Sequence, residues 1–225
     1  MKHGKKYQEA AKKVDRNKLY GLSEASNLVK EMHFAKFDET VELHMKLTLK
    51  KSQSVRDTVV LPNQFSAEKR ILVFAKGDKA QEALDAGATY AGTEYIEKVK
   101  GGWLDFDVAV ATPDMMKDVG RLGMVLGRKG LMPNPKTGTV TPNIAEAVNE
   151  LKKGRTEFRA DKTGVVHIPV GKVSMDAKDT AENVTTFMTE LDRKKPVDAK
   201  IGFIRSVSIS SSMGPGVWVA FQEEN

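Results

Sequence analysis

The sequence contains no cysteine among its 225 residues. This absence excludes disulfide bonds, thiol nucleophiles and thiolate metal sites, and it fits a reducing cytoplasm. No run of 18 apolar residues occurs, so we expect no membrane span, and the charged N-terminus lacks the apolar core of a secretory signal. The four histidines show no metal-ligand spacing such as H-E-x-x-H, so we expect no metal site.

Positive charge is concentrated in the first 18 residues. They hold seven cations and two acids, a net +5 of the +6 carried by the whole chain. The composition of the whole chain, with 40% hydrophobic and 29% charged residues, is that of a soluble globular protein. The basic segment is compatible with a solvated tail or with an arm that binds nucleic acid.

Both ends of the chain show the alternation typical of strands with one buried face. In 37–50, apolar residues occupy every second position from 41 to 49. A helix is expected over 23–33, with Ser23 as its cap. The segments 157–160 and 165–170 flank a four-residue turn and predict a hairpin. The remaining expected elements are a long amphipathic helix over 176–194 and strands over 57–61, 197–209 and 217–221.

The middle of the chain has a different pattern of apolar residues. Continuous apolar runs at 71–75 and 106–111 are typical of strands buried on both faces. Helices are expected over 78–86, 93–100 and 143–152, and another is expected to open at 112–114. Strands that alternate with helices at this spacing predict an α/β domain with a parallel sheet.

Because the two ends resemble each other and the middle does not, we expect a discontinuous domain of residues 1–66 and 159–225 with an inserted α/β domain of residues 67–158. The two crossings, near 63–68 and 154–158, would form a hinge. Two consecutive domains are the alternative, but they would leave the edge of the first sheet unpaired.

The segment 120–138 is rich in glycine and basic residues. It holds five glycines together with Arg121, Arg128, Lys129 and Lys136. Glycine allows a partner to approach the backbone closely, and cations beside it favour a phosphate-bearing partner. Its residues 127–130, ending at Gly130, match the G-x-x-G pattern of nucleotide-clamping loops. Four residues match easily by chance and the expected helix order differs from that module, so we interpret the match only as a loop that favours phosphate. A mobile surface loop is the alternative.

No catalytic constellation is found. Neither G-x-G-x-x-G nor G-x-x-x-x-G-K-[ST] occurs, so we expect no nucleotide cofactor. Asp105, Asp107 and Asp114 are interpreted as structural residues. An α/β enzyme or nucleotide-binding protein centred on the middle domain remains the rival hypothesis, and a strong thermal shift with a small nucleotide would favour it.

The run 206–212 is rich in hydroxyls. In a strand, Ser206, Ser208, Ser210 and Ser212 would share one face. Such a surface suits contact with ribose 2′-hydroxyls and phosphates, although it is equally compatible with a solvated sheet face. Gly214 and Gly216 would also allow backbone amides to approach a ligand.

Four motifs, in order, resemble the universal L1 family of bacterial large-subunit ribosomal proteins, which sit in the mobile stalk beside the tRNA exit site. They are FDETVE at 37–42, GRKGLMPNPKTG at 127–138, FRADKTG at 158–164 and SMGP at 212–215. The resemblance implies a split β-α-β terminal domain and a Rossmann-like three-layer inserted domain. It also implies a protein that is not an enzyme and needs no cofactor.

The resemblance further implies direct binding to the stalk of large-subunit ribosomal RNA, a part in release of exit-site tRNA, and repression of the protein's own operon through a similar site on its messenger RNA. The protein would be cytoplasmic, ribosome-associated and monomeric when free. The implied RNA contacts are Lys36, Phe37, Thr40, Glu42, Asp161, Lys162, Thr163, Gly164, His167, Ser206, Ser212, Met213 and Gly214. A weaker second contact would come from Arg121, Arg128, Lys129, Gly130 and Lys136. Ser212 stands where the family usually has threonine.

Overall fold

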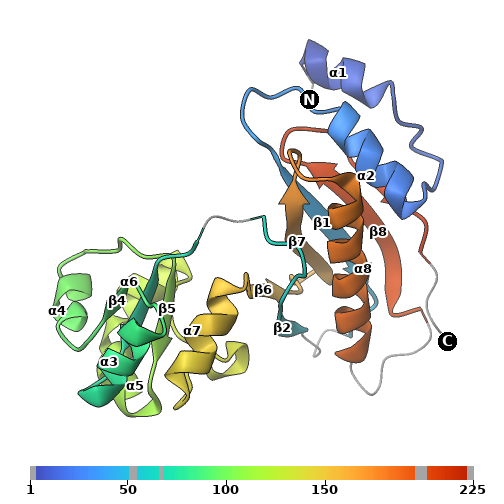
Figure 1. Cartoon of the computed structure of the whole chain (residues 1–225). Coiled ribbons are helices and arrows are strands. Elements are labelled where there is room, and N and C mark those ends of the chain that lie inside the picture. The colour runs from blue at the N-terminus through green and yellow to red at the C-terminus, as the bar shows by residue number, and fades with distance from the viewer. Residues whose placement is uncertain (1–3, 51–54, 66–67, 196–201, 222–225) are drawn as a thin grey trace. The chain divides into compact units, whose positions relative to one another are not determined.

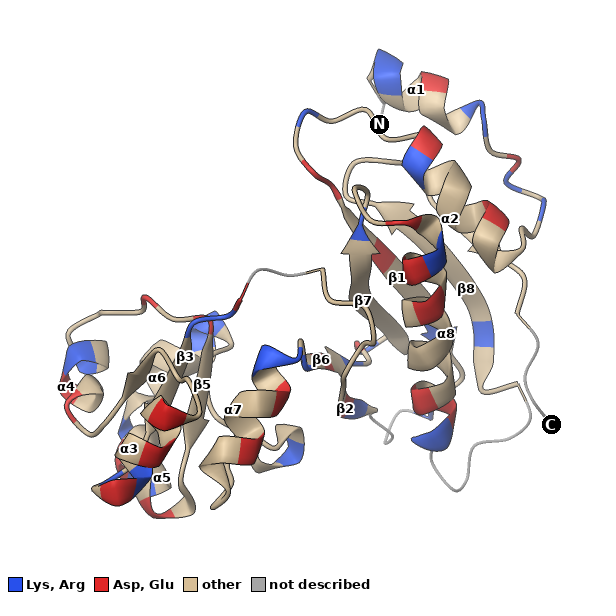
Figure 2. Ribbon diagram, in the orientation of Figure 1, with Lys and Arg blue, Asp and Glu red and all other residues tan. Residues whose placement is uncertain are grey.

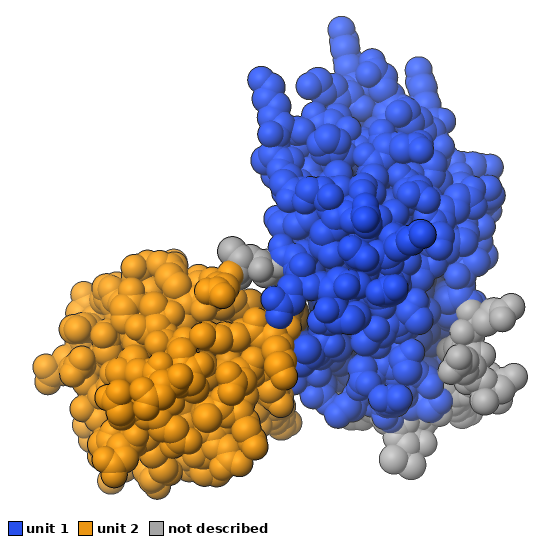
Figure 3. Space-filling model, in the orientation of Figure 1, with its two compact units in different colours: residues 1–65, 157–225 blue, residues 66–156 orange. Residues whose placement is uncertain are grey.

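The computed structural model describes residues 4–50, 55–65, 68–195 and 202–221 (Figure 1). The chain forms two compact units (Figure 3). Unit 1 comprises Met1–Phe65 and Glu157–Asn225, and unit 2 comprises Ser66–Thr156. Unit 1 is therefore built from both ends of the chain. The second change of unit falls at the start of strand β6 (Thr156–Arg159), whereas the sequence placed it after residue 158.

Unit 1 contains a four-stranded antiparallel sheet in the order β7-β1-β8-β9. Its strands are β1 (Thr40–Leu47), β7 (Val165–Lys172), β8 (Ile204–Ser211) and β9 (Val217–Val219). Helix α8 (Ala177–Arg193) connects β7 to β8, and β1 pairs between these two strands. Because β7 and β8 both run antiparallel to β1, they form a β-α-β unit that β1 splits. The part of the expected strand 197–209 that covers 197–201 lies outside the described residues.

Helices α2 (Leu22–Glu31) and α8 cover one face of this sheet (Figure 1). Every second residue of β1 is buried beneath them, as the alternation predicted. The core continues to Phe158 and Phe187, whose rings meet edge to face with centroids 5.0 Å apart. The expected cap of α2 was wrong, because Gly21 is the N-cap and Ser23 lies inside the helix.

The expected hairpin between 157–160 and 165–170 forms only in its turn. An isolated antiparallel bridge joins Ala160 to Val166. Beyond it β6 pairs with β2 (Arg56–Val59), while β7 pairs with β1. The two arms separate because Phe158 packs into the core against α8, where its burial outweighs a continued ladder with β7.

Helix α1 (Lys5–Ala11) belongs to unit 1 and is docked on it. Ala10 and Val14 are buried in the same core as the sheet. The ammonium of Lys13 donates to the carbonyl of Glu31 at the end of α2, 3.3 Å away. The basic segment is therefore a packed element over its described residues and not a solvated tail.

Unit 2 contains a three-stranded parallel sheet in the order β4-β3-β5. Its strands are β3 (Ile71–Phe74), β4 (Tyr90–Ala91) and β5 (Val108–Ala111). Alternate residues of β3 face two separate cores. One core includes helices α3 (Asp78–Asp85) and α7 (Ile144–Lys152), and the other includes α4 (Tyr95–Lys100), α5 (Met116–Val119) and α6 (Gly123–Lys129). The unit therefore has three layers, with the sheet in the middle.

The expected loop at 120–138 was wrong over its first half. The 3₁₀ turns η1 (Pro113–Met115) and η2 (Gly120–Leu122) join α5 and α6 into an almost continuous helical run. Buried residues at helical spacing explain it, because Met115, Val119, Leu122 and Leu126 all pack on the sheet. The free energy gained by their burial offsets the cost of each glycine in a helix, which is roughly 1 kcal/mol relative to alanine. A further 3₁₀ turn, η3 (Pro135–Thr137), follows.

Candidate nucleic-acid interface

The face of the unit 1 sheet opposite α2 and α8 is polar. On β1 it carries Glu42, His44 and Lys46, which are all partly exposed. The strand register places Ser210 opposite Glu42, Ser208 opposite His44, and Ser206 opposite Lys46. His167 lies opposite His44 on the other side. The structure thus brings together Glu42, His167 and Ser206, three residues that the sequence nominated from three distant segments. We call this surface the open face.

Three residues of the open face were missed by sequence reasoning. They are His44, Lys46 and Trp218, the last of which lies opposite Ser208 on β9 and is 41% exposed. The alternation in 37–50 already placed His44 and Lys46 on the polar face of the strand. Trp218 was detectable because it lies between two valines in the expected strand 217–221, so its side chain points to the face opposite theirs.

The two histidines of the open face are hydrogen-bonded to each other. Nδ1 of His44 and Nδ1 of His167 are 2.8 Å apart, so one ring donates and the other accepts. Nε2 of His44 also lies 3.0 Å from the hydroxyl of Ser210. Burial and the neighbouring His167 lower the pKa of His44 below its usual range, against an opposing effect of Glu42.

The end of the open face near the start of β1 is closed by contacts between Thr40 and Ser212. The Ser212 N–H donates to the Thr40 carbonyl at 3.0 Å, and the Thr40 N–H donates to the Ser212 hydroxyl at 3.2 Å. The Lys172 ammonium donates to the Thr40 hydroxyl at 3.0 Å. Beside this pair, Phe37 is 55% exposed and Met213 is 52% exposed. Both side chains are therefore available to pack against a partner at this end of the open face.

A buried carboxylate, which the sequence did not nominate, holds this end together. Glu39 has no exposed surface. Its Oε1 accepts from the Ala35 N–H at 3.1 Å and its Oε2 from the Met213 N–H at 2.9 Å. Burial opposes ionisation of Glu39, yet hydrogen bonds from the Ser211 hydroxyl and from backbone amides, including that of Met213, hold its pKa below the usual range.

The expectation that backbone amides beside Gly214 would meet a ligand was wrong for 212–214. The amide of Ser212 donates to Thr40, that of Met213 to Glu39, and that of Gly214 to the Ser211 carbonyl. A Cβ at position 214 would lie 2.5 Å from the Ser211 hydroxyl. A side chain at position 214 would therefore force the Ser211 hydroxyl, which bonds to Glu39, to move.

The turn 161–164 closes the opposite end of the open face. The Asp161 carboxylate accepts from the Val165 N–H at 2.8 Å and from the N–H and hydroxyl of Thr163. The hydrogen bonds from Val165 and Thr163 lower the pKa of Asp161. Lys46 donates to the Thr163 carbonyl, which ties the turn to β1. Asp161 thus shapes the turn, and Gly164 is buried at a φ of 78°.

The two ends of the open face lie roughly 24 Å apart, because seven steps along β1 from Thr40 to Leu47 advance about 3.4 Å each. Lys36 and Lys162 are exposed near opposite ends. The helix-covered face includes a helix of net negative charge, since α8 carries four acidic residues against two basic ones, Lys178 and Arg193 (Figure 2). A polyanion is therefore favoured on the open face over the helical one.

The nominated residues of unit 2 do not form a phosphate-binding loop. Arg128 and Lys129 lie in the last turn of α6, and Gly130 is its left-handed C-cap. The C-terminal end of a helix presents carbonyls and a negative partial charge, so only side chains there can attract phosphate. Lys136 lies in η3, where its N–H donates to the Asn134 side chain at 2.9 Å.

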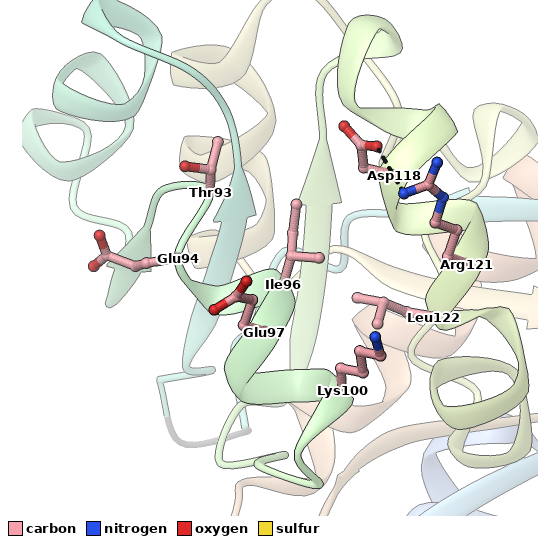
Figure 4. A pocket seen from close by; sticks show the side chains of 8 residues that line it. All are labelled: Thr93, Glu94, Ile96, Glu97, Lys100, Asp118, Arg121 and Leu122. Carbon is pink, nitrogen blue, oxygen red and sulfur yellow. Dashed lines mark ion pairs between the residues drawn. The ribbon is translucent and has the colours of Figure 1, made fainter.

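Arg121 lines a shallow pocket between α4 and η2 (Figure 4). Its guanidinium lies 3.9 Å from the Asp118 carboxylate, and the pocket also holds Glu94, Glu97 and Lys100. The mixed charge does not favour an anionic small molecule. Asp105 and Asp107, which the sequence assigned structural roles, both bond to the Arg70 guanidinium.

Among the described residues, no three His, Asp or Glu side chains gather as a metal ion would require. The described helices are too short or too polar to cross a lipid bilayer.

The chain is similar to known ribosomal proteins along its whole length. The model of the ribosomal protein L1p/L10e family matches residues 29–215. A Treponema denticola protein named large ribosomal subunit protein uL1 is 70% identical over 223 residues, 99% of each chain. Proteins of the same name from Treponema pallidum and Borreliella burgdorferi are 65% identical over 225 residues and 59% identical over 221 residues, covering 100% and 98% of each chain.

Proposed function

Because the chain belongs to the ribosomal protein L1p/L10e family, we propose that it binds large-subunit ribosomal RNA directly through the open face of unit 1. It is a ribosomal protein of the large subunit and not an enzyme. By the same family resemblance, we propose that it is cytoplasmic, is monomeric when free, takes part in release of exit-site tRNA, and represses its own operon by binding a similar fold in the messenger RNA.

The observation that carries the RNA proposal is the arrangement of polar, basic and apolar side chains on the open face. A hydroxyl row on β8 and polar groups on β1 lie between two ends that carry exposed lysines, and Phe37 and Met213 are exposed at one end. Folded RNA presents the complementary groups, namely 2′-hydroxyls, phosphates and unstacked bases. The length of roughly 24 Å suits several nucleotides and exceeds a small metabolite.

Each nominated residue has a role that its surroundings support. Phe37 and Met213 pack against a base or ribose, and Lys36 and Lys162 neutralise phosphates. The Thr40, Ser206 and Ser212 hydroxyls bond to 2′-hydroxyls or phosphates, while Thr163, whose hydroxyl already donates to Asp161, accepts from a 2′-hydroxyl. Glu42 accepts from a 2′-hydroxyl or an amino group. His167 contributes a ring nitrogen, while Asp161, Gly164 and Gly214 shape the backbone.

The helical run of unit 2 supports a second, weaker RNA contact. Gly120, Gly123 and Gly127 have helical backbones, and a Cβ at each would meet nothing within 4 Å. Packing inside the protein therefore does not explain three glycines that each lower helix stability. An external partner that approaches the helix closely does explain them. Met124, 85% exposed, lies between Arg121 and Arg128 on the same stretch.

Binding of the full chain to transcribed large-subunit ribosomal RNA tests the main site. We expect Phe37→Ala and Met213→Ala each to weaken binding about 5- to 150-fold, the cost of roughly 1–3 kcal/mol for a lost stacking platform. Leu84→Ala is the matched control, because Leu84 is an exposed apolar residue of α3 at 42% exposure. Unchanged affinity in both Phe37 and Met213 variants would exclude this site.

Hydroxyl-radical footprinting of the same complex tests which surface and which RNA are in contact. One compact protected region in the RNA is expected, and it should shrink in the Phe37→Ala variant. Repression is tested separately by translating the protein's own operon messenger in vitro. Added wild-type protein should lower synthesis, and the Phe37→Ala protein should do so only at higher concentration.

A further inference from the structure

A groove in unit 1 lies between α1 and the loop that follows β8, beside the open face. One wall is formed by Lys5, Lys6 and Tyr7 at the start of α1, and the other by Phe34, Ser212 and Met213. Its volume is about 630 Å³, within the range of roughly 300–1,000 Å³ typical of sites for single small ligands. Neither the family resemblance nor the open face assigned any role to α1.

The groove is chemically suited to a nucleotide. Tyr7, Phe34 and Met213 offer two rings and a thioether, which are surfaces on which a base can stack. Lys5 and Lys6 are exposed, and within the described part of the chain neither forms an ion pair. Among the described residues that line the groove, none is acidic. Cations beside aromatic surface are the combination that single-stranded nucleic acid requires, whereas an acidic peptide would make no use of the rings.

The walls are held by tertiary contacts, so the groove exists before a ligand arrives. On the α1 side, Ala10 and Val14 are anchored in the core. The Asp15 N–H donates to the Tyr20 hydroxyl at 2.9 Å, which fixes the chain that follows α1. On the other side, Glu39 holds the Met213 backbone. A preformed groove lowers the ordering cost of binding.

We propose that this groove captures one unstacked nucleotide of the RNA that occupies the open face, with its base between Tyr7 and Met213 and its phosphates beside Lys5 and Lys6. The proposal rests on the proposed function, because Ser212 and Met213 line the groove and also lie at the end of the open face near the start of β1. We call this end, with Phe37, Ser212 and Met213, the rim. RNA that passes this rim is carried directly into the groove. Lys5 and Lys6 would then bind the phosphates of one particular nucleotide, in addition to attracting RNA through their charge.

The test compares two double variants with equal loss of charge. Lys5→Ala with Lys6→Ala removes the groove cations, while Lys12→Ala with Arg16→Ala removes two exposed cations of the same segment that do not line the groove. Each full-length protein is titrated with transcribed large-subunit ribosomal RNA at several salt concentrations. We expect the groove variant to bind at least about five-fold more weakly than the control and to show the smaller salt slope. Equal losses of RNA affinity in the two variants would mean that α1 contributes only non-specific electrostatic attraction, and would overturn the proposal.

Tyr7 separates stacking from charge. Tyr7→Ala is expected to weaken binding about 5- to 150-fold, and Tyr7→Phe to bind like the wild type because the ring remains. Equal weakening by both substitutions would overturn the role of the ring. Circular dichroism of each variant establishes that the fold is kept.

Because the chain lacks cysteine, a single Glu9→Cys substitution on the exposed side of α1 can carry a tethered iron chelate. Cleavage confined to one short RNA segment next to the footprint supports the proposal, and dispersed cleavage contradicts it.

Failure of the groove proposal is distinguishable from failure of the proposed function. In the first case Phe37→Ala still weakens RNA binding while the groove variants match their controls, and in the second case Phe37→Ala has no effect. If the groove variants bind naked RNA normally but fail to enter ribosomes, the occupant is a protein and the nucleotide assignment is wrong.

Discussion

The carboxylate of Glu39 accepts a hydrogen bond from the backbone N–H of Met213, 174 residues later in the sequence, at 2.9 Å. Its other oxygen accepts from Ala35, two residues before Phe37. One buried charge thus fixes both loops that present the exposed apolar residues of the rim. The shape of the proposed RNA site therefore depends on the ionisation of Glu39, a buried residue that we do not expect RNA to contact.

Glu39→Gln is therefore expected to lower the free energy of unfolding by about 1–3 kcal/mol, because an amide replaces a carboxylate oxygen with a donor facing other donors. Urea unfolding measures this change. Glu24→Gln is the control, since Glu24 forms an exposed ion pair with Lys18 at 2.9 Å and should change stability by less than about 1 kcal/mol. RNA affinity should fall in the Glu39 variant as well. A Glu39→Gln protein as stable as the wild type would contradict the anchoring role.

The pH dependence of this difference has a definite sign. The pKa of Glu39 is lowered in the folded protein, so its contribution to stability is present above the ordinary glutamate pKa of about 4.3 and is lost as the pH falls through the folded value. The stability gap between wild type and Glu39→Gln should narrow on acidification. A gap that widens toward low pH would refute the assignment.

His44 should titrate below the usual histidine range, because it is partly buried and adjoins His167. The unfolded chain then binds protons more readily, so this group lowers stability as the pH falls from about 6.5 through the folded value. NMR titration of the ring protons measures the pKa. His167→Gln should raise it by removing the neighbouring charge, and Glu42→Gln should lower it further. Shifts in the same direction for both variants would be inconsistent with this arrangement.

The helical glycines of unit 2 predict a trade between stability and binding. Gly120→Ala and Gly127→Ala should each stabilise the protein by about 0.5–1 kcal/mol, since both backbones are helical and the new methyl meets open space. If RNA packs against this helix, the same variants should bind more weakly. Gly130→Ala is the control with the opposite effect on stability, because Gly130 has a φ of 72°. Thermal unfolding and RNA titration measure both quantities, and stabilised variants with normal binding would remove this contact from the proposal.

Local periodicity was sufficient to predict most strands and helices. The alternation around Val41 and Leu43 gave a strand with one buried face, and the apolar run from Ile71 to Phe74 gave a strand between two cores. These signals are readable because side-chain direction repeats every two residues in any strand. The nomination of the open face from Glu42, His167 and Ser206 came from the family resemblance together with the hydroxyl spacing of one strand.

Tertiary packing decided what local patterns could not. Glycines 120, 123 and 127 suggested a loop, but burial of Leu122 and Leu126 on the sheet made the segment helical. The pattern also gave no sign that α1 docks beside the loop at 212–214, or that Glu39 holds that loop in place. The amino-acid sequence by itself determined which faces are apolar, since that depends on neighbours along the chain. The partners of each buried polar group were decided only when segments more than a hundred residues apart met, because a hydrogen bond depends on distance in space.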